Sequence, residues 1–577
     1  MADDITKQNE DQVDDIQAAK AQWEKKTREP YLETAPETVK EFKTLSGNPV
    51  EPIYTPDDIK NVDFRKDIGF PGELPFTRGR TPNGYRSFDW PHDFYAGFGS
   101  SESANERYRD LVKHGANVIT LALDLPTQIG LDSDDPKAKG EVGKVGVALS
   151  SLSDFERTLD GIDQLKTGIG NVANSIGPYA LCLSLGLAER RGIDPAYFKH
   201  FRLQNDPLKE FSGRGTYILP VEAAIELSTD AVEYICNNFQ DKWHWQWIPQ
   251  YVCTGQMRSA GVSAAQEIGF GFAHFLTYIE SSLKRGLRLE DFVPKMELHA
   301  ESDIDLFEEA AKFRAARRLW AKLMQERYKA THPGVLGLRI STYASISRQI
   351  AQQPLNNMAR ITLQVLAAFL GGSEHIWAPA YDEALALPTS ESTRIANQVK
   401  FIVHHEGGLK NTVDPLAGSY YVEKLTSQLE EEARHWLQEI EQKGGVAKAI
   451  ENGFYHTEEL KGLYKYQKDV ESAERKILGI NYMQIKEELP IDIFGVDPED
   501  ETRQVVRLQK LKETRDNRLV KQRLEMLGEA AEKKTAQSGV NLVPVMLDAV
   551  KADATVGEIY GVLRKVFGEF KPPLKIM

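Results

Sequence analysis

Three short apolar runs of the sequence are each followed by polar side chains, which together could bind an anion. The polar groups are Gln204-Asn205-Asp206 with Arg214 further on, Gly255-Gln256, and His299-Ala300-Glu301. Each group alone is better explained as ordinary polar loop residues. Together, at the ends of successive parallel strands, they would meet at one mouth and favour a site. An arginine there suits a carboxylate or another anion, because its guanidinium can donate two parallel hydrogen bonds.

A further group, His404-His405-Glu406, contains residue types that ligate metals. Adjacent residues point in different directions, so we favour a surface or structural role and predict no metal ligands. The sequence contains no Walker A loop, HExxH or GxSxG motif. Residue patterns alone therefore indicate a β/α enzyme that binds an anion.

The elements that would position these groups alternate along residues 69–445. Apolar runs are followed by turn residues and then by amphipathic stretches such as Ala310–Leu323. The runs are Val118–Leu125, Phe201–Gln204, Ile248–Cys253, Val293–Leu298 and Val335–Ile340. This alternation predicts parallel β/α units. The length of the region suits an α/β fold of the (β/α)8 TIM-barrel type, and a flavodoxin-like sheet is the alternative.

The two ends of the chain have a different composition. Residues 1–68 predict an extended N-terminal arm with a helix near Val13–Arg28. A disordered tail is an equal alternative, although its aromatic residues favour packing. Residues 446–577 predict a C-terminal helical extension, with one long exposed helix over Lys510–Lys533 and an amphipathic helix over Thr555–Phe570.

Composition excludes several classes of protein. The 577 residues carry a net charge of -14, which argues against nonspecific nucleic-acid binding. There are three cysteines, none in a CxxC spacing, as is typical of a reducing compartment. The acidic N-terminus is not a targeting peptide, and no apolar run of about 18 residues predicts a membrane span. We expect a cytoplasmic protein without membrane partners.

Motif by motif, the chain resembles the large catalytic subunit of the methylmalonyl-CoA mutase family. The matching segments keep the family's order and spacing, and the C-terminal segment 555–570 matches as well. They are PGELPFTRGR (71–80), YAGFGSSESANERYR (95–109), LDSDDPKAKGEVGKVGVAL (131–149), QNDPLKEFSGRGTYI (204–218), FRAARRLWAKL (313–323), NNMARITLQVLAAFLGG (356–372), DEALALPTSESTRIANQ (382–398), VDPLAGSYYVE (413–423) and TVGEIYGVLRKVFGEF (555–570).

The resemblance implies an adenosylcobalamin-dependent isomerase, in which an adenosyl radical takes hydrogen from the substrate and the acyl-CoA group moves to the adjacent carbon. In the family, the CoA chain threads the barrel and the corrin closes its mouth. The cobalt-ligating DxHxxG motif does not occur in this sequence. We therefore expect the cobalamin-binding domain in a separate small subunit, which ligates the cobalt, within a heterodimer or heterotetramer.

The resemblance also implies roles for residues of this chain. Tyr95 would lie between substrate and adenosyl group, Arg214 would bind a free substrate carboxylate, and Gln256 would orient the thioester carbonyl. The substrate-binding set is Gln204, Arg214, Thr120, Lys295 and His299. The cofactor-binding set is Leu123, Val145, Gly213, Arg214, Glu383 (on the adenosyl ribose) and Ala386.

Several positions depart from the family pattern. Gln256 replaces the carbonyl-binding histidine, and glutamine donates a hydrogen bond without acting as an acid. The other departures are Phe88 and Asp93 for two arginines, Lys295 and Glu297 for an arginine–serine pair, His299 for phenylalanine, Tyr343 for glutamine and Ser259 for glutamate. They predict a succinyl- or malonyl-CoA carrying an alkyl or aryl substituent. A divergent methylmalonyl-CoA mutase and a non-catalytic scaffold subunit are the alternatives.

Overall fold

Parallel strands form the centre of the computed structural model, which describes residues 15–239, 247–485, 493–537 and 539–572. Two sheets are present in these residues, with strand orders β1-β2-β3-β4-β5 and β6-β7-β8-β9. The strands are β1 Asp93–Ala96, β2 Val118–Leu121, β3 Gly168–Val172, β4 Phe201–Gln204, β5 Trp247–Ile248, β6 Gln250–Cys253, β7 Met296–Ser302, β8 Ile340–Ala344 and β9 His375–Trp377.

The two sheets join into one barrel, because β4 lies beside β6 and β1 lies beside β9. Strands β5 and β6 are two parts of the same barrel strand. Pro249 separates them, since proline has no N–H to donate to the ladder. Eight strand positions therefore surround the axis. The (β/α)8 barrel prediction is confirmed, and the flavodoxin-like alternative is wrong.

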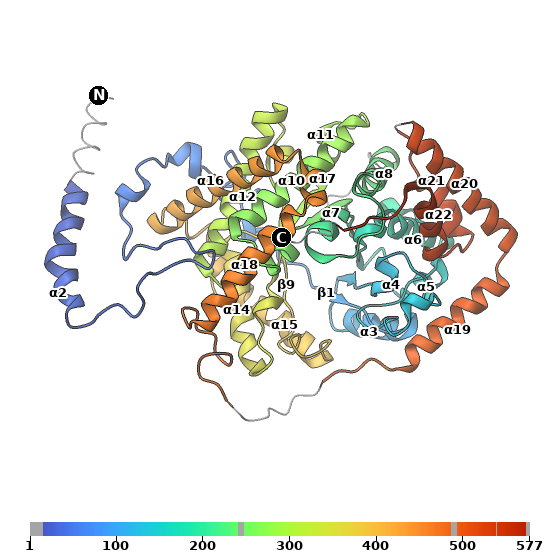
Figure 1. The fold of residues 1–577 in the computed structure, drawn as a ribbon, viewed down its shortest axis with the longest axis horizontal. Helices are drawn as coiled ribbons and strands as arrows, with labels where there is room; N and C mark the ends of the chain where they lie inside the picture. The colour runs from blue at the N-terminus through green and yellow to red at the C-terminus, as the bar shows by residue number, and fades with distance from the viewer. Residues whose placement is uncertain (1–14, 240–246, 486–492, 538, 573–577) are drawn as a thin grey trace.

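Helices follow the strands and cover the barrel (Figure 1). The larger ones are α3 Ser101–Lys113, α5 Leu152–Thr158, α6 Gly177–Arg190, α8 Val221–Phe239, α10 Ala264–Lys284, α12 Leu306–Tyr328, α14 Asn357–Leu370, α15 Ser390–Phe401 and α16 Tyr420–Gln442. The helix predicted over Ala310–Leu323 is confirmed within α12. Helix α16 packs against both α10 and α12, where Arg314 pairs with Glu423. These contacts hold the β6–β9 side of the barrel.

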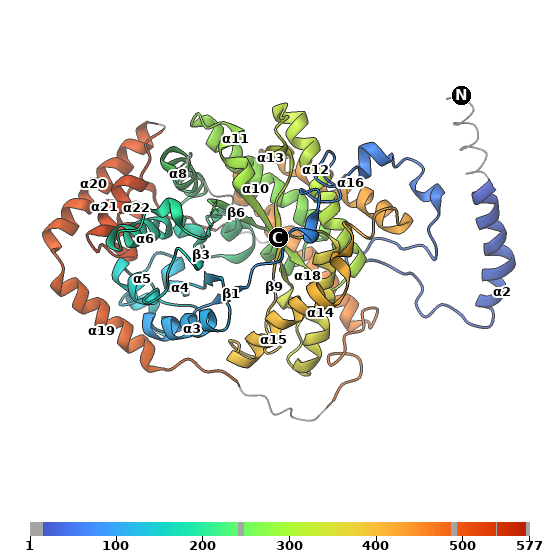
Figure 2. The same cartoon turned by 180° about the vertical axis from the view of Figure 1, so that it is seen from behind.

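The N-terminal arm only partly packs on the barrel. Residues 15–23 are helical and continue into η1 (Glu24–Arg28) and α2 (Glu29–Leu32), which stand clear of the barrel in Figures 1 and 2. Tyr31 is 65% exposed. Further along, the Tyr54 ring lies 4.9 Å from that of Tyr421 on α16. Of the predicted helix Val13–Arg28, the first two residues lie outside the described ones.

The C-terminal part is helical, as predicted, with α17 Val446–Glu451, α18 Phe454–Glu471, α19 Glu499–Thr514, α20 Asn517–Ala536, α21 Val543–Lys551 and α22 Val556–Phe567. Helix α22 confirms the amphipathic prediction, since Ile559 and Leu563 are fully buried. The prediction of a single long exposed helix over Lys510–Lys533 is wrong. Helix α19 ends at Thr514, and Asp516 caps the separate helix α20 by accepting from the N–H groups of Arg518 and Leu519. Helix α20 also buries Leu527 and Ala531.

Two strands begin later in the chain than predicted. The strand predicted over Val293–Leu298 begins only at Met296, because Pro294 lies in a 3-10 turn. The strand predicted over Val335–Ile340 begins at Ile340, since Val335 lies in the short helix α13 (Pro333–Leu336). Among the residues described, no helix is both long and apolar enough to cross a membrane.

Candidate active site

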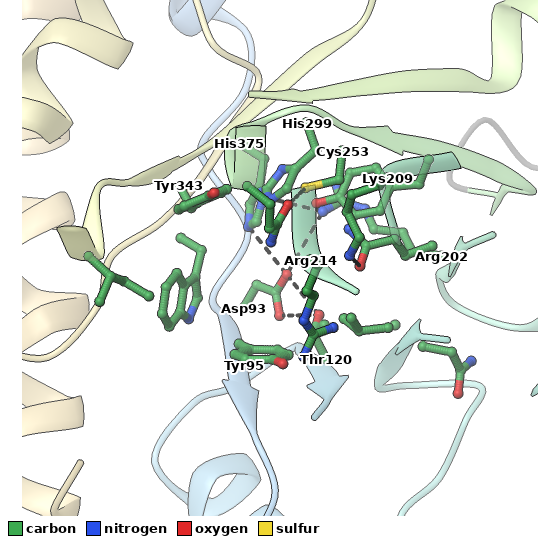
Figure 3. A pocket seen from close by; sticks show the side chains of 18 of the residues that line it. Asp93, Tyr95, Thr120, Arg202, Lys209, Arg214, Cys253, His299, Tyr343 and His375 are labelled. Carbon is green, nitrogen blue, oxygen red and sulfur yellow. Dashed lines mark hydrogen bonds and ion pairs between the residues drawn. The ribbon is translucent and has the colours of Figure 1, made fainter. Parts of the chain in front are cut away.

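One cavity of about 210 Å³ opens among the strands and receives a side chain from every position of the barrel. Figure 3 shows side chains from strands β1–β4 and from strands β6–β9 pointing into this cavity. Of the residues predicted from sequence, it brings together Tyr95, Thr120, Gln204, Arg214, Gln256, His299 and Glu383. Polar groups far apart in the sequence therefore form one site, as their positions after strands predicted.

Two cations lie on one side of the cavity. Arg214 ends a π-helical turn after β4, and its Nη1 donates to Gln128 Oε1 at 2.6 Å. The guanidinium has five donors, so this bond leaves others for a carboxylate. Lys209 is fully buried, with Nζ 3.0 Å from Glu210 Oε1 and 3.5 Å from Gln204 Oε1. Arg214 is exposed and lies 3.8 Å from the same Glu210 oxygen, so a substrate anion would meet one buried and one accessible cation that share a buried carboxylate.

The Gln256 amide has a defined orientation. The Cys253 thiol donates to Gln256 Oε1 across 2.8 Å, which turns the Nε2 donors away from Cys253. Burial raises the pKa of Cys253 to about 12, so the thiol keeps its proton. Both side chains line the cavity. Gln256 is thus arranged to donate, as a neutral group, to a carbonyl oxygen.

A buried ionic layer forms the wall below Tyr95. Asp93 accepts from Thr120 Oγ1 at 2.9 Å, and its Oδ2 lies 3.3 Å from His375 Nε2 and 3.8 Å from Arg202 Nη1. Burial alone would raise the pKa of Asp93, but the neighbouring His375 and Arg202 lower it well below its usual range. Arg202 also reaches Glu297, at 3.8 Å. Thr120 is therefore held by Asp93 while it lines the cavity.

Glu383 lies at another part of the cavity wall. Burial, reinforced by Asp382, raises the pKa of Glu383 to about 7. Its Oε2 is buried and has no hydrogen-bond partner among the described residues. Buried polar atoms are normally satisfied, so this oxygen points to a ligand with a hydroxyl or N–H group.

Aromatic rings line the β6–β9 side of the same cavity. Tyr251, His299, Tyr343 and Trp377 come from β6, β7, β8 and β9. Burial, helped by the nearby charges of His375 and Arg202, holds the pKa of His299 well below its usual range, so the ring is neutral. Its Nδ1 lies 2.9 Å from Ser341 Oγ.

Other predicted residues lie outside the cavity. Lys295 precedes β7 at the amino-terminal end of the barrel, where burial and the nearby Arg339 and Arg80 lower its pKa to about 8. Leu123, Val145, Gly213 and Ala386 do not line the cavity, and Val145 is 56% exposed. Their roles in binding a cofactor stay predictions.

Three members of the strand-end groups serve the structure instead. Asn205 donates to the Ser228 carbonyl, and Asp206 accepts from the Tyr278 hydroxyl at 2.7 Å. Glu301 accepts from Ser259 and lies outside the cavity. Each of the three groups still contributes to the cavity, through Gln204 and Arg214, Gln256, and His299.

Sequence reasoning missed several lining residues. Lys209 lies within a quoted motif, but a buried lysine has no local sequence pattern. Asn171 and Trp377 lie on strands that were not predicted, since β3 is glycine-rich and β9 has three residues. His375 and Cys253 also line the cavity. Alternation along correctly placed strands is the one pattern that would have found them.

The His404-His405-Glu406 group gains a partner that the sequence did not suggest. Ligand atoms of Asp89, His404 and His405 lie within 4.8 Å of one another. His404 Nε2 is 2.8 Å from Asp89, and the Lys410 ammonium lies 3.6 Å from Asp89 and 3.3 Å from His405 Nδ1. Because a lysine cation already contacts two of the three residues, the structural interpretation remains the preferred prediction.

A β/α barrel with cations, a neutral amide and an unsatisfied carboxyl group in one cavity is typical of an enzyme. The methylmalonyl-CoA mutase family matches residues 43–569, and the chain belongs to that family. It is therefore a mutase of acyl-CoA thioesters.

Named relatives cover nearly the whole chain. The 2-hydroxyisobutanoyl-CoA mutase large subunit of Aquincola tertiaricarbonis is 33% identical over 96% of this chain and 97% of its own length. The methylmalonyl-CoA mutase of Rhizobium meliloti is 35% identical over 92% of this chain and 73% of its own length. The mitochondrial methylmalonyl-CoA mutase of Homo sapiens is 33% identical, over 92% and 69%.

Proposed function

We propose that the chain is the large catalytic subunit of an adenosylcobalamin-dependent mutase acting on an alkyl- or aryl-substituted succinyl- or malonyl-CoA. The observation that carries this proposal is the cavity itself. Arg214 and Lys209 offer a carboxylate site, and Gln256 offers a carbonyl donor beside them. These groups would be enough to bind the carboxylate and the carbonyl of methylmalonyl-CoA. The rest of the cavity wall is large and aromatic, which favours a substrate with an additional substituent.

Each residue has a defined task in this proposal. Arg214 binds the free carboxylate and fixes the carbon skeleton, because a bidentate pair sets both distance and direction. Gln256 donates to the thioester carbonyl while the acyl group moves. Tyr95 covers the reacting carbon, with its ring 5.5 Å from that of Trp377. Burial raises the pKa of Tyr95, so its hydroxyl stays protonated.

The residues present fit the cofactor. When bound, adenosylcobalamin supplies the radical that abstracts hydrogen from the substrate. Glu383 would hold the adenosyl ribose, since its buried Oε2 lacks a partner among the described residues. The surrounding wall excludes water from reactive species.

We propose a separate cobalamin-binding subunit by analogy with a relative. The chain covers 97% of a protein named as a large subunit, and that name implies a small partner. We propose that such a small partner subunit ligates the cobalt, in a heterodimer or heterotetramer in the cytoplasm.

Reconstitution tests the proposal. The purified chain with adenosylcobalamin and acyl-CoA should show no turnover, and addition of a small DxHxxG-containing protein should restore it. Full turnover by the single chain would contradict the two-subunit assignment.

Methylmalonyl-CoA mutase activity is the second candidate. It is favoured by the retained Tyr95 and Arg214 and by the names of the relatives. The same reconstituted enzyme distinguishes the two candidates through its preferred ester.

A further inference from the structure

The aromatic side of the cavity forms a continuous row across four neighbouring strand positions. Its members, here called the aromatic row, are Tyr251, His299, Tyr343 and Trp377. Ring centroids are 4.6 Å apart between Tyr251 and His299, 5.2 Å between His299 and Tyr343, and 6.5 Å between Tyr343 and Trp377. The order of the rings follows the strand order β6-β7-β8-β9.

Three polar atoms of the row have partners within the protein, among them the Tyr251 hydroxyl, which hydrogen-bonds with Ser341. The Tyr343 hydroxyl hydrogen-bonds with Ser259, outside the cavity lining, and His299 Nδ1 contacts Ser341. The His299 ring is neutral because burial lowers its pKa. Beyond Tyr343, Ile346 is 36% exposed and also lines the cavity. With these hydroxyl groups engaged, the rings and Ile346 offer a ligand ring-carbon and aliphatic surface.

Gly255 makes room for Tyr343. A Cβ at position 255 would lie 2.2 Å from the Tyr343 hydroxyl and 2.4 Å from two ring carbons, well inside van der Waals contact. The ring thus occupies space that any larger residue at position 255 would fill. Glycine at 255 and tyrosine at 343 form one interdependent feature of the pocket.

The charged layer adjoins one part of the row, because Arg202 Nη1 lies 3.3 Å from His375 Nδ1 on β9. In the view of Figure 3, Tyr343 lies to the left of the labelled Lys209 and Arg202. A substrate whose carboxylate meets Arg214 and whose carbonyl meets Gln256 turns its remaining side to the aromatic row. Burying a charge against these rings would be costly, whereas burying hydrocarbon is favourable.

We propose that the aromatic row is the specificity site of the enzyme and binds an apolar branch on the carbon skeleton of the acyl thioester. Tyr343 and Trp377 contact the branch, and Gly255 keeps the Tyr343 ring in place. This inference rests on the proposed function and names the residues that select its substituted substrate.

Equilibrium binding to the full-length chain, without cofactor, separates this inference from the test of turnover. Isothermal titration would compare 2-phenylsuccinyl-CoA and 2-butylsuccinyl-CoA with succinyl-CoA. The unmodified chain should bind the substituted esters at least about tenfold more tightly, the lower range for filling an apolar pocket. Tyr343→Phe should keep this preference, because it keeps the ring.

Tyr343→Ala, Trp377→Ala and Gly255→Ala should each weaken binding of the two substituted esters more than binding of succinyl-CoA, so that the preference falls to within about threefold of equality. Tyr197→Ala is the matched aromatic control, since Tyr197 is 63% exposed and outside the cavity lining. Thermal unfolding would confirm that each variant folds. Trp377 is half-buried, so its variant keeps the test valid if Gly255→Ala destabilises the chain.

Three outcomes would overturn the inference: equal losses for all three esters, an unchanged preference in the Trp377 and Tyr343 alanine variants, or no preference in the unmodified chain. If the reconstituted enzyme turns over methylmalonyl-CoA best although the chain binds substituted esters selectively, the proposed function fails and the binding site stands.

Discussion

The two halves of the barrel wall differ in chemistry although they share one architecture. The β1–β4 half presents charged and hydrogen-bonding groups, such as Asp93, Thr120 and Arg202, while the β6–β9 half presents the aromatic row. The short helical segments after β4 add Lys209 and Arg214 beside the polar half. The difference teaches that one barrel can hold the constant part of a substrate with one half and select its variable part with the other.

Replacement of Arg214 in the polar half should cause the largest loss of kcat/KM. Arg214→Gln removes the carboxylate partner, and truncating a buried charge pair costs about 2–5 kcal/mol, or about 30-fold to several thousand-fold in kcat/KM. Arg214→Lys should recover part of the loss, because it keeps the charge without the bidentate geometry. Steady-state kinetics with an acid-bearing ester measure both. Unchanged kinetics in Arg214→Gln would remove the carboxylate assignment.

Substitution of Glu383 tests whether this residue binds the cofactor. Glu383→Gln should weaken adenosylcobalamin binding about 10- to 100-fold, as expected for a hydrogen bond to a charged group. Since the pKa of Glu383 is about 7, the carboxylate forms as pH rises through 7 and affinity should rise with it. The variant should lose this dependence, as followed by cobalamin absorbance. A pH dependence that survives in Glu383→Gln would assign the titration to another group.

Exchange of Gln256 for histidine tests whether this residue influences the choice between methylmalonyl-CoA and a substituted ester. Gln256 does not titrate, and the low pKa of His299 keeps that ring neutral, so neither should add an ionisation to the pH–rate profile between about pH 5 and 8. Gln256→His should introduce one. It should raise methylmalonyl-CoA turnover about tenfold, less than the 10²–10⁴ of a well-placed acid, and give no gain with a substituted ester. A gain with both esters would show that Gln256 is unrelated to substrate choice.

The smallest expected effect concerns the orientation of that amide. Cys253→Ala removes the donor to Gln256 Oε1 and should lower kcat about 2- to 5-fold, in line with about 0.5–1 kcal/mol for a weak hydrogen bond. Cys253→Ser keeps a donor and serves as the matched control. Equal losses in both variants would indicate a packing effect.

Much of the polar half was predictable from sequence, because its residues follow strands and lie in family motifs. Gln204 ends β4 and Arg214 follows it, and the apolar run defined this strand with correct bounds. The aromatic row was largely hidden. Trp377 lies on a strand of three residues, and the Tyr343 strand was predicted some residues too early. The contact between Gly255 and Tyr343 joins positions 88 residues apart, which no local pattern reveals.

The C-terminal region shows the same limit. The helical prediction held for α22, where the apolar spacing is regular. The error over Lys510–Lys533 came from its charge, which suggested solvent exposure. Packing of Val520 and Leu527 against the β1–β4 half decides the fold there, together with the Asp516 cap.

Substrate preference of the reconstituted enzyme tests the central claim most directly. The measurement is kcat/KM for methylmalonyl-CoA, 2-butylsuccinyl-CoA and 2-phenylsuccinyl-CoA with the small subunit and adenosylcobalamin present. We predict that a substituted ester exceeds methylmalonyl-CoA by at least about tenfold, since the aromatic row would otherwise stay unfilled. The highest kcat/KM with methylmalonyl-CoA would contradict this account.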